Sequence, residues 1–305
     1  MMETKDGAEL CFPELLNTSC RKPAPPGSEA VLGHILMSSV SVLTVTLNLL
    51  VIISVSHFRQ LHFPSNLLLL SLAVSDFLVG LLVLPSEIFR QSACWFLGDL
   101  MCSLYNYVTL IITSASVGDM VLISVDRYVA VCDPLHYSTR VTVRRVQTSI
   151  CMCWFTSVCY CGLISKGDLT HPGRPRISCF GECVIVMNDI TGVVDLVVTF
   201  ISPISVIVVL YVRVFVVAVS QARAMRSHVT ALTHKPSVNV RTKKSELKAA
   251  RALGVVVVFI ICFCPYYCVF LAGENLLNAQ SGAFVLYVFY FNSCINPVIY
   301  ALFYP

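Results

Sequence analysis

Seven long apolar runs constrain this chain more than any other feature of its sequence. They cover residues 31–56, 66–86, 104–131, 148–165, 190–219, 249–272 and 282–304. A helix needs about 20 apolar residues to cross a bilayer, and these runs are too long, and alternate too little, to be strands of a membrane barrel. The sequence therefore predicts an all-α membrane protein, in which residues 31–305 form a seven-transmembrane-helix bundle behind an N-terminal segment of residues 1–30.

The low charge content agrees with this prediction. Only 12% of the 305 residues are charged and 56% are hydrophobic, whereas about 25% of the residues in a soluble domain are charged. The first 30 residues lack the charged start and apolar centre of a cleavable signal peptide, so we expect the first apolar run to direct insertion. The net charge of +4 reflects membrane topology and does not indicate nucleic-acid binding.

The basic residues predict the orientation in the membrane. Most of the 21 lysines and arginines follow the first, third and fifth runs, as Arg59, Arg144 and Lys243 do. Because cytoplasmic loops are rich in Lys and Arg, we expect an extracellular N-terminus. The sequon Asn17-Thr18-Ser19 then predicts glycosylation of Asn17. The expected extracellular side also carries six cysteines that an oxidising compartment can pair: Cys11, Cys20, Cys94, Cys102, Cys179 and Cys183.

Several polar residues fall inside the apolar runs, where each needs a partner, a cavity or a function. Those expected to meet in the bundle centre are Asn48, Asp76, Asn292, Ser293 and Asn296. Such a cluster can hold water and a cation, with Na⁺ at Asp76, or can serve only as interhelical hydrogen bonding. Kinks are predicted where a proline removes a backbone hydrogen bond, at Pro203, Pro265 and Pro297.

The third run ends in the charged sequence "DRYVAVCDPLHY", residues 126–137. The neighbouring Asp126 and Arg127 can form an ion pair where the helix meets water. Arg127 could instead turn inward and bind the exposed helix end of a partner protein. A charged helix end that only anchors the membrane boundary explains the same residues.

Motifs on successive runs occur in a recognisable order. They are Asn48, Asp76, Asp126-Arg127-Tyr128, Trp154, Pro203, "CFCP" (262–265) and "NPVIY" (296–300). Over nearly the whole chain this order resembles the rhodopsin-like G-protein-coupled receptors. The resemblance implies a ligand pocket that opens outward, a Cys102–Cys183 disulfide and G-protein contact inside, to which the basic stretch 241–251 could add. It also assigns the cytoplasmic switch to Asp126, Arg127, Tyr128, Asn296, Pro297 and Tyr300.

Three segments resemble the trace amine-associated receptors more narrowly. These are "CFPELLNTSC" (11–20), "SCFGEC" (178–183) and "NSCINPVIYALFYP" (292–305). This resemblance implies a second disulfide, Cys20–Cys179, and leaves Cys11 and Cys94 without assigned partners. It also implies a chemosensory receptor in the plasma membrane that binds small amines and acts through a stimulatory G protein.

One expected residue is missing. Amine receptors characteristically carry an aspartate seven residues after the outer cysteine of span three, where this chain has Thr109. A carboxylate lies instead in "GVVDLVVTF" (192–200), at Asp195. Burying an isolated aspartate in hydrocarbon costs roughly 2.5–3.5 kcal/mol, and some fish trace amine receptors resemble this pattern. We therefore expect Asp195 to be a relocated amine counter-ion, although a hydrogen bond to a neighbouring helix is an alternative.

The family geometry surrounds Asp195 with further ligand contacts. Besides Thr109 they are Thr113, Thr199, Phe263, Tyr266, Tyr267 and Tyr290. Thr199 lies one turn from Asp195 on the same helix face, and the aromatic rings can attract an ammonium group. Phe263 replaces the tryptophan that the family usually has in its "CWxP" motif, so the indole N–H donor is lost.

Two other acids are expected to have different roles. Asp119 should form a structural hydrogen bond near Ser71 and Trp154, away from the ligand. Glu87, which follows Pro85 at the outer end of the second run, is expected to be a solvated residue at the pocket mouth. A contact between Glu87 and the second ammonium group of a diamine is the alternative.

Other functional classes are less well supported. Thr109 favours a rhodopsin-like receptor for a non-amine ligand. A non-signalling truncated product is another alternative, because the chain ends at "FYP", where the family continues into a helix and tail. An opsin is disfavoured because Tyr290 occupies the position of the retinal-linking lysine. No inverted repeat indicates a transporter, and no metal-ligand spacing, nucleophile–base pair or phosphate loop indicates an enzyme or a cofactor.

Overall fold

The computed structural model describes residues 10–14, 19–22, 27–166, 179–184, 189–232, 239–272 and 279–303. The predicted glycosylation site Asn17 lies outside these residues. Within them the regular structure is helical, and the only β-type pairings are two isolated bridges, Leu10 with Arg21 and Ser19 with Phe180.

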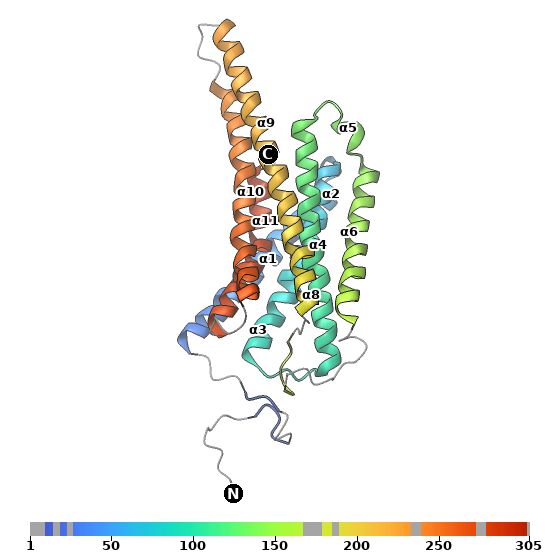
Figure 1. Ribbon diagram of the computed structural model, residues 1–305, viewed down its shortest axis with the longest axis vertical. Helices are drawn as coiled ribbons and strands as arrows, with labels where there is room; N and C mark the ends of the chain where they lie inside the picture. The colour runs from blue at the N-terminus through green and yellow to red at the C-terminus, as the bar shows by residue number, and fades with distance from the viewer. Residues whose placement is uncertain are drawn as a thin grey trace.

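Each predicted apolar run lies in a helix or in consecutive helical segments (Figure 1). The first four runs correspond to α1 (Ser28–His57), α2 (Pro64–Leu78) with η2 (Val79–Val83) and α3 (Leu84–Ser92), α4 (Gly98–Cys132), and α6 (Val143–Ile164). The last three correspond to α8 (Asp189–Asp195) with η3 (Leu196–Ile201) and α9 (Ser202–Leu232), α10 (Asn239–Ala272), and α11 (Ala279–Phe303). Short turns η1 (Arg59–Leu61) and α5 (Tyr137–Arg140) lie in connections.

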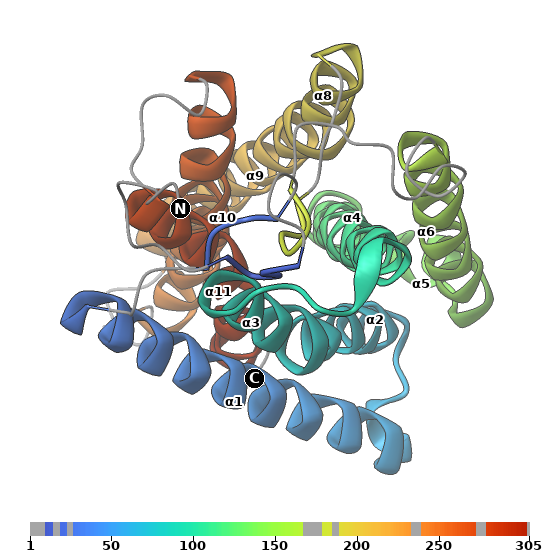
Figure 2. The same cartoon turned by 90° about the horizontal axis from the view of Figure 1, so that it is seen from below.

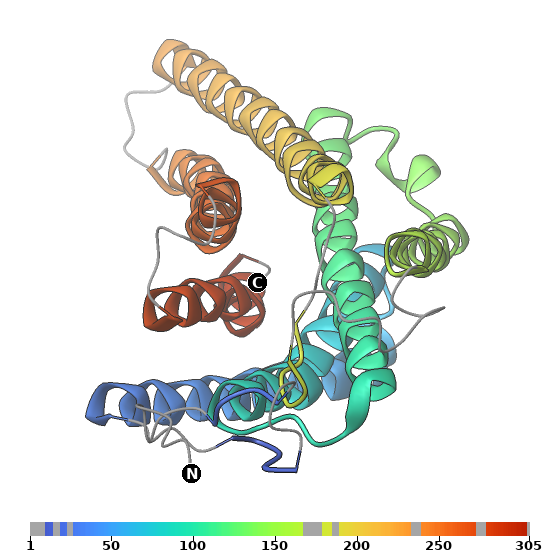
Figure 3. The same ribbon diagram turned by 60° about the horizontal axis from the view of Figure 1, so that its bottom comes forward.

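The long helices form a bundle around a shared interior. Helices α1, α2, α4, α9, α10 and α11 contact one another in sequence to close a ring, and α6 packs outside it against α2 and α4. Figures 2 and 3 show this ring from below and at an angle. We call the end that carries residues 10–14, 19–22 and 179–184 the N-terminal face, and the end that carries α5 the opposite face.

The outer surface of the bundle matches a lipid environment. Five helices are long and apolar enough to cross a membrane, and the apolar segments Gly254–Val269 and Phe284–Ile299 of α10 and α11 are shorter. On α1 the side chains of Leu36, Leu50 and Ile53 are each more than half exposed. Exposing such side chains to lipid tails carries little cost because the tails are equally apolar. The chain is a multi-pass membrane protein.

Two π-helical turns interrupt the bundle helices, each just before a proline. Segment η2 precedes Pro85 and η3 precedes Pro203. A proline lacks the N–H for the i→i−4 bond and clashes with that carbonyl, so a widened turn accommodates it. Helices α10 and α11 continue through Pro265 and Pro297. The π turn before Pro203 begins directly after Asp195 and thus lies at the predicted ligand site.

Candidate functional site

Three disulfides fasten the N-terminal face. They join Cys11 to Cys94, Cys20 to Cys179, and Cys102 to Cys183. The second and third are the pairs that the family resemblance implies. The first corrects the sequence analysis, which left its two cysteines without partners. It attaches the N-terminal segment to the connection between α3 and α4, so this segment is anchored at two points.

Backbone hydrogen bonds hold the same segments together. The Cys20 N–H donates to the Phe180 carbonyl over 2.9 Å, and the Trp95 N–H donates to the Gly181 carbonyl over 2.8 Å. Gly181 has φ +109°, and an added Cβ would approach the Cys11 Cβ to 2.7 Å, so only glycine fits without strain. Figure 2 shows these segments across the middle of the helix ring, where they cover the interior.

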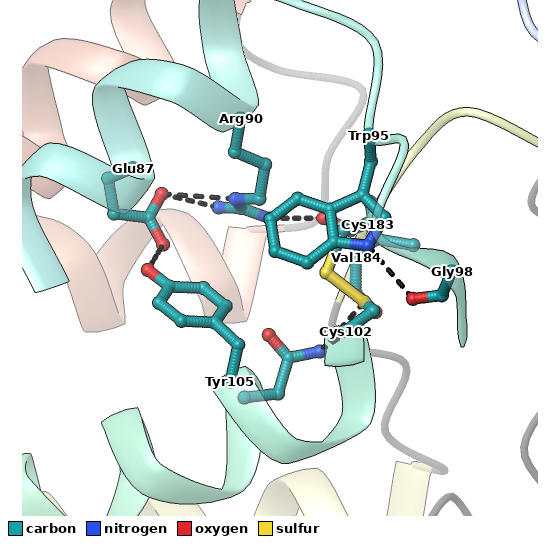
Figure 4. The surroundings of a disulfide bond; sticks show 9 residues. Glu87, Arg90, Trp95, Gly98, Cys102, Tyr105, Cys183 and Val184 are labelled. Atoms are coloured by element: carbon teal, nitrogen blue, oxygen red, sulfur yellow. Dashed lines mark hydrogen bonds and ion pairs between the residues drawn. A yellow bond between two sulfur atoms is a disulfide. The ribbon is translucent and has the colours of Figure 1, made fainter. Parts of the chain in front are cut away.

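The buried Glu87 and the half-buried Arg90 form an ion pair beneath this cover (Figure 4). The Arg90 Nη2 donates to Glu87 Oε2 over 2.6 Å, and its Nη1 donates to the Cys183 carbonyl over 2.8 Å. The Tyr105 hydroxyl donates to Glu87 Oε1 over 2.8 Å. Glu87 is only 4% exposed. The expectation of a solvated residue at the pocket mouth is therefore wrong, because Arg90, one helical turn away, neutralises the carboxylate inside the bundle.

Asp195 lies at the junction of α8 and η3, and its partners among the described residues are hydroxyl groups. The Tyr160 hydroxyl of α6 donates to Asp195 Oδ1 over 3.0 Å. The Thr199 hydroxyl lies 2.6 Å from the Asp195 carbonyl oxygen and 3.4 Å from Oδ2. Among the described side chains no cation forms an ion pair with Asp195. The carboxylate is half-buried, and when ionised its charge is not balanced by any of the described side chains.

Tyr160 is a site residue that the sequence analysis missed. A tyrosine inside the fourth span is compatible with plain packing, and its partner lies 35 residues further along the chain. The only available signal was that a buried tyrosine hydroxyl usually finds a hydrogen-bond partner.

An aromatic cluster on α10 and α11 adjoins Asp195. The Tyr267 hydroxyl lies 2.9 Å from the Thr199 hydroxyl. The Tyr267 ring stacks on Phe200, with ring centroids 4.2 Å apart. The same cluster continues through Tyr266, Phe289, Phe263 and Phe259, which contact one another edge-on, tilted or stacked. Tyr290 packs edge-on against Phe289. The predicted ligand residues of spans five, six and seven are therefore contiguous.

The threonines of α4 differ in their surroundings. Thr109 is only 5% exposed, and its Oγ1 has no hydrogen-bond partner among the described residues. Buried hydroxyl groups are rarely left unpaired, so the Thr109 hydroxyl is a candidate contact for a polar group of a ligand. Thr113, one turn further along α4, is half-buried.

Asp119 faces a different part of the molecule. The Ser71 hydroxyl donates to Asp119 Oδ2 over 2.7 Å, and the Trp154 Nε1 donates to the Ser71 oxygen over 3.1 Å. Asp119 is on α4, the helix that also carries Thr109, and its carboxyl group lies between α2, α4 and α6. Asp119 has the two neighbours that the sequence analysis assigned to it.

Asp76 is the centre of a polar cluster deeper in the bundle. It is fully buried, and it accepts hydrogen bonds from Asn296 Nδ2 over 2.8 Å and from the Ser116 hydroxyl over 3.3 Å. Asn48 reaches the Ser293 carbonyl over 3.1 Å. Carboxylate, hydroxyl and carbonyl oxygens are the ligand types that hard cations prefer, so this donor set fits Na⁺.

Asn292 lies apart from the contacts of Asp76. Its Nδ2 is 3.8 Å from the Met120 sulfur, and it borders a cavity of about 20 Å³ that Tyr211, Phe259 and Asn296 also line. That volume is enough for about one water molecule. Asn292 is thus buried in the bundle centre beside Asn296, while the hydrogen bonds of Asp76 go to Asn296 and Ser116.

The charged sequence at the end of α4 forms its own network near the opposite face. Arg127 Nη2 lies 2.8 Å from Asp126 Oδ2, while the Tyr137 hydroxyl donates to Asp126 Oδ1 over 2.8 Å. Burial raises the pKa of Tyr137, so its phenol remains a donor. Tyr128 packs against the core. The side chains of Tyr300 and of the basic stretch 241–251 lie outside the described ones.

The comparison with protein families agrees with this geometry. Residues 47–300 match the model of the seven-transmembrane receptors of the rhodopsin family. The chain belongs to this family and, within it, to the trace amine-associated receptors. It is a G-protein-coupled receptor and not an enzyme, and a ligand and a G protein are the partners of the family.

The curated relatives carry the narrower assignment. The chain is 34% identical to trace amine-associated receptor 4 of Mus musculus, covering 97% of this chain and 88% of the relative. It is 36% identical to trace amine-associated receptor 13c of Danio rerio, covering 98% and 90%. It is 38% identical to trace amine-associated receptor 8b of Mus musculus, covering 97% and 89%.

Proposed function

We propose that this receptor binds small amines, with Asp195 as the counter-ion of the ligand's ammonium group. The observation that carries the proposal is the environment of Asp195, where a half-buried carboxylate has hydroxyl partners and no cation among the described side chains. An intramembrane acid is expensive to bury and usually marks a function. A ligand ammonium would supply the missing positive charge.

The hydroxyl groups of Tyr160 and Thr199 orient the carboxylate for this role. A close charge pair in a water-poor site is favourable only when further hydrogen bonds satisfy the remaining lone pairs. Both hydroxyls lie within 3.4 Å of the Asp195 carboxylate oxygens. Truncating one partner of such a buried charge pair typically costs about 2–5 kcal/mol, which is at least about 30-fold in affinity.

The neighbouring aromatic rings and Thr109 complete the proposed site. Tyr267 joins Asp195 through Thr199, and ring faces attract ammonium groups by about 0.5–2 kcal/mol. The unpaired Thr109 hydroxyl can bond a polar group of the ligand. Thr113, Tyr266, Phe263 and Tyr290 would supply the remaining contacts.

Ligand binding would then shift α10 relative to its neighbours. The stack of Tyr267, Phe289, Phe263 and Phe259 extends from the ligand site to the small cavity beside Asn296. A ligand that binds one arrangement of this stack more tightly favours that arrangement. The proposed result is that Arg127 becomes available to a G protein, with Tyr128, Asn296, Pro297 and Tyr300 as parts of the switch.

Further parts of the proposal follow from the family. We place the receptor in the plasma membrane with an extracellular N-terminus and assign it a chemosensory role and a stimulatory G protein. Na⁺ bound at Asp76 would stabilise the inactive arrangement. An antibody against an N-terminal tag tests the orientation, because it should label intact cells without permeabilisation.

The ligand proposal is tested by cyclic AMP responses of cells that express the full receptor. A panel of primary amines is applied to the wild type and to Asp195→Asn, with cell-surface labelling of both. We expect at least a 30-fold loss of amine potency in Asp195→Asn at equal surface level. An unchanged response would reduce Asp195 to a structural acid. Activation by neutral hydroxyl compounds, dependent on Thr109, would favour a non-amine ligand instead.

A further inference from the structure

We infer that the binding site is built for an amine with a single positive charge, because the second acid of the site is already neutralised by Arg90. This inference rests on the proposed function. It concerns which amines bind: monoamines should be preferred over diamines of the same chain length.

Glu87 already has a cation and a hydroxyl group as partners. Its carboxylate receives hydrogen bonds from Arg90 Nε at 3.2 Å, from Arg90 Nη2 at 2.6 Å and from Tyr105 at 2.8 Å. Its side chain is only 5% exposed. Water cannot screen this pair well, so its attraction is strong, and an incoming ammonium would have to displace a cation that belongs to the same helix (Figure 4).

Arg90 is held from two sides, by Glu87 and by the cover. Its Nη1 donates to the Cys183 carbonyl over 2.8 Å, and Cys183 is bonded to Cys102 of α4. The guanidinium is thus fixed between α3 and the disulfide-tethered segment. Displacing it would break a charged contact to Glu87 and a hydrogen bond to the cover, so a second ammonium group would gain its contact with Glu87 only at the cost of both.

The pair also lies beside a predicted ligand residue of α4. Tyr105, which donates to Glu87 Oε1 over 2.8 Å, precedes Thr109 by one turn on the same helix. A diamine that reaches from Asp195 to Thr109 would therefore bring its second ammonium toward the region that contains Arg90.

The charged side chains described in this region leave one carboxylate without a cation. Asp195 contributes one negative charge, and Glu87 with Arg90 contributes none. One ammonium completes the site. A second would be buried without a free anion, which is costly, and it would be repelled by the guanidinium.

The experiment measures the potency of n-alkylamines of four to eight carbons and of the α,ω-diamines of equal length. Potency is read from the cyclic AMP response of cells that express the full receptor. We expect the monoamine to be at least tenfold more potent than its diamine on the wild type. Arg90→Gln retains a hydrogen-bond donor but frees the Glu87 charge, so it should shift this ratio at least tenfold toward the diamine. The double variant Glu87→Gln/Arg90→Gln removes both charges and should keep the wild-type ratio.

The outcomes separate the inference from the proposed function. A wild-type preference for diamines that Glu87→Gln abolishes would overturn the inference and leave the proposed function intact. A ratio unchanged by Arg90→Gln at normal surface level would also overturn it. If Arg90→Gln does not reach the surface, the wild-type ratio decides alone. If neither amine series acts, the proposed function fails, and the inference fails with it.

Discussion

Two acids, Glu87 and Asp195, lie in the half of the bundle toward the N-terminal face, and their surroundings differ. Glu87 is 4% exposed and has a guanidinium within 2.6 Å. Asp195 is half-buried and has only hydroxyl partners among the described residues. Among the described residues, Glu87 thus has a cation and Asp195 has none. We infer that the neutralised Glu87 stabilises the cover, whereas Asp195, which has no cation among the described residues, is available to a ligand.

This contrast also separates folding from binding. A buried ion pair is costly to break, because removal of one partner leaves an unpaired charge. An acid without a cation leaves no such charge behind when it is neutralised. Substitutions at the two positions should therefore affect different measurements, and this difference can be tested directly.

The largest expected effect is on stability, at Glu87. Glu87→Gln leaves Arg90 charged and unpaired, and we expect a loss of about 2–4 kcal/mol, below the ~3–5 kcal/mol of a fully buried pair because the Arg90 side chain is 22% exposed. The thermal unfolding midpoint of the purified receptor measures it. Glu87→Gln/Arg90→Met should regain most of the loss. Equal midpoints for wild type and Glu87→Gln would contradict the assigned role of the ion pair.

A smaller effect is expected on ligand potency, at Tyr160. Tyr160→Phe removes the hydroxyl 3.0 Å from Asp195 Oδ1 while keeping the ring. A hydrogen bond to a charged group contributes about 1.5–3 kcal/mol, so amine potency should fall by about tenfold or more. Tyr107→Phe, which removes a hydroxyl that bonds the Val158 carbonyl, is the matched control and should leave potency within about threefold. A loss of equal size in both variants would count against the Asp195 site.

Thr199 should have a weaker influence on potency. Its hydroxyl lies 3.4 Å from Asp195 Oδ2 and 2.9 Å from the Tyr267 hydroxyl. Thr199→Val keeps the shape and removes both contacts, and a net hydrogen bond contributes about 0.5–1.5 kcal/mol. We expect a decrease of roughly 2- to 10-fold in amine potency by the cyclic AMP assay. An increase in potency would show that Thr199 competes with the ligand for Asp195.

The smallest effect is the expected change in stability at Asp195 itself. Asp195→Asn neutralises an acid without a described cation, so the ligand-free unfolding midpoint should stay unchanged or rise slightly. In the presence of a saturating amine, the wild type should gain stability and the variant should not, because a ligand stabilises only a folded state that binds it. A large drop in the ligand-free midpoint would indicate a structural acid and weaken the contrast with Glu87.

The sequence predicted the fold well because the bilayer sets the length of each apolar run. It also predicted that Asp195 and Thr199 share one face of the fifth span, and the structure has the Thr199 hydroxyl 3.4 Å from Asp195 Oδ2. The Cys11–Cys94 disulfide was missed because pairing among six cysteines cannot be deduced from sequence. The ion pair had a readable signal, since Glu87 and Arg90 are three residues apart on one helix face. Tyr160 was missed because its partner lies on another helix.

The central claim is that the ligand's counter-ion lies at Asp195 instead of Thr109. The measurement that tests it most directly is the amine potency of Asp195→Asn/Thr109→Asp relative to Asp195→Asn alone. Thr109 is buried with an unpaired hydroxyl, so a carboxylate there can meet the same ligand. We predict recovery of at least about tenfold, with none in Asp195→Asn/Thr109→Asn. Wild-type potency in surface-expressed Asp195→Asn, or no recovery in the double variant, would contradict the claim.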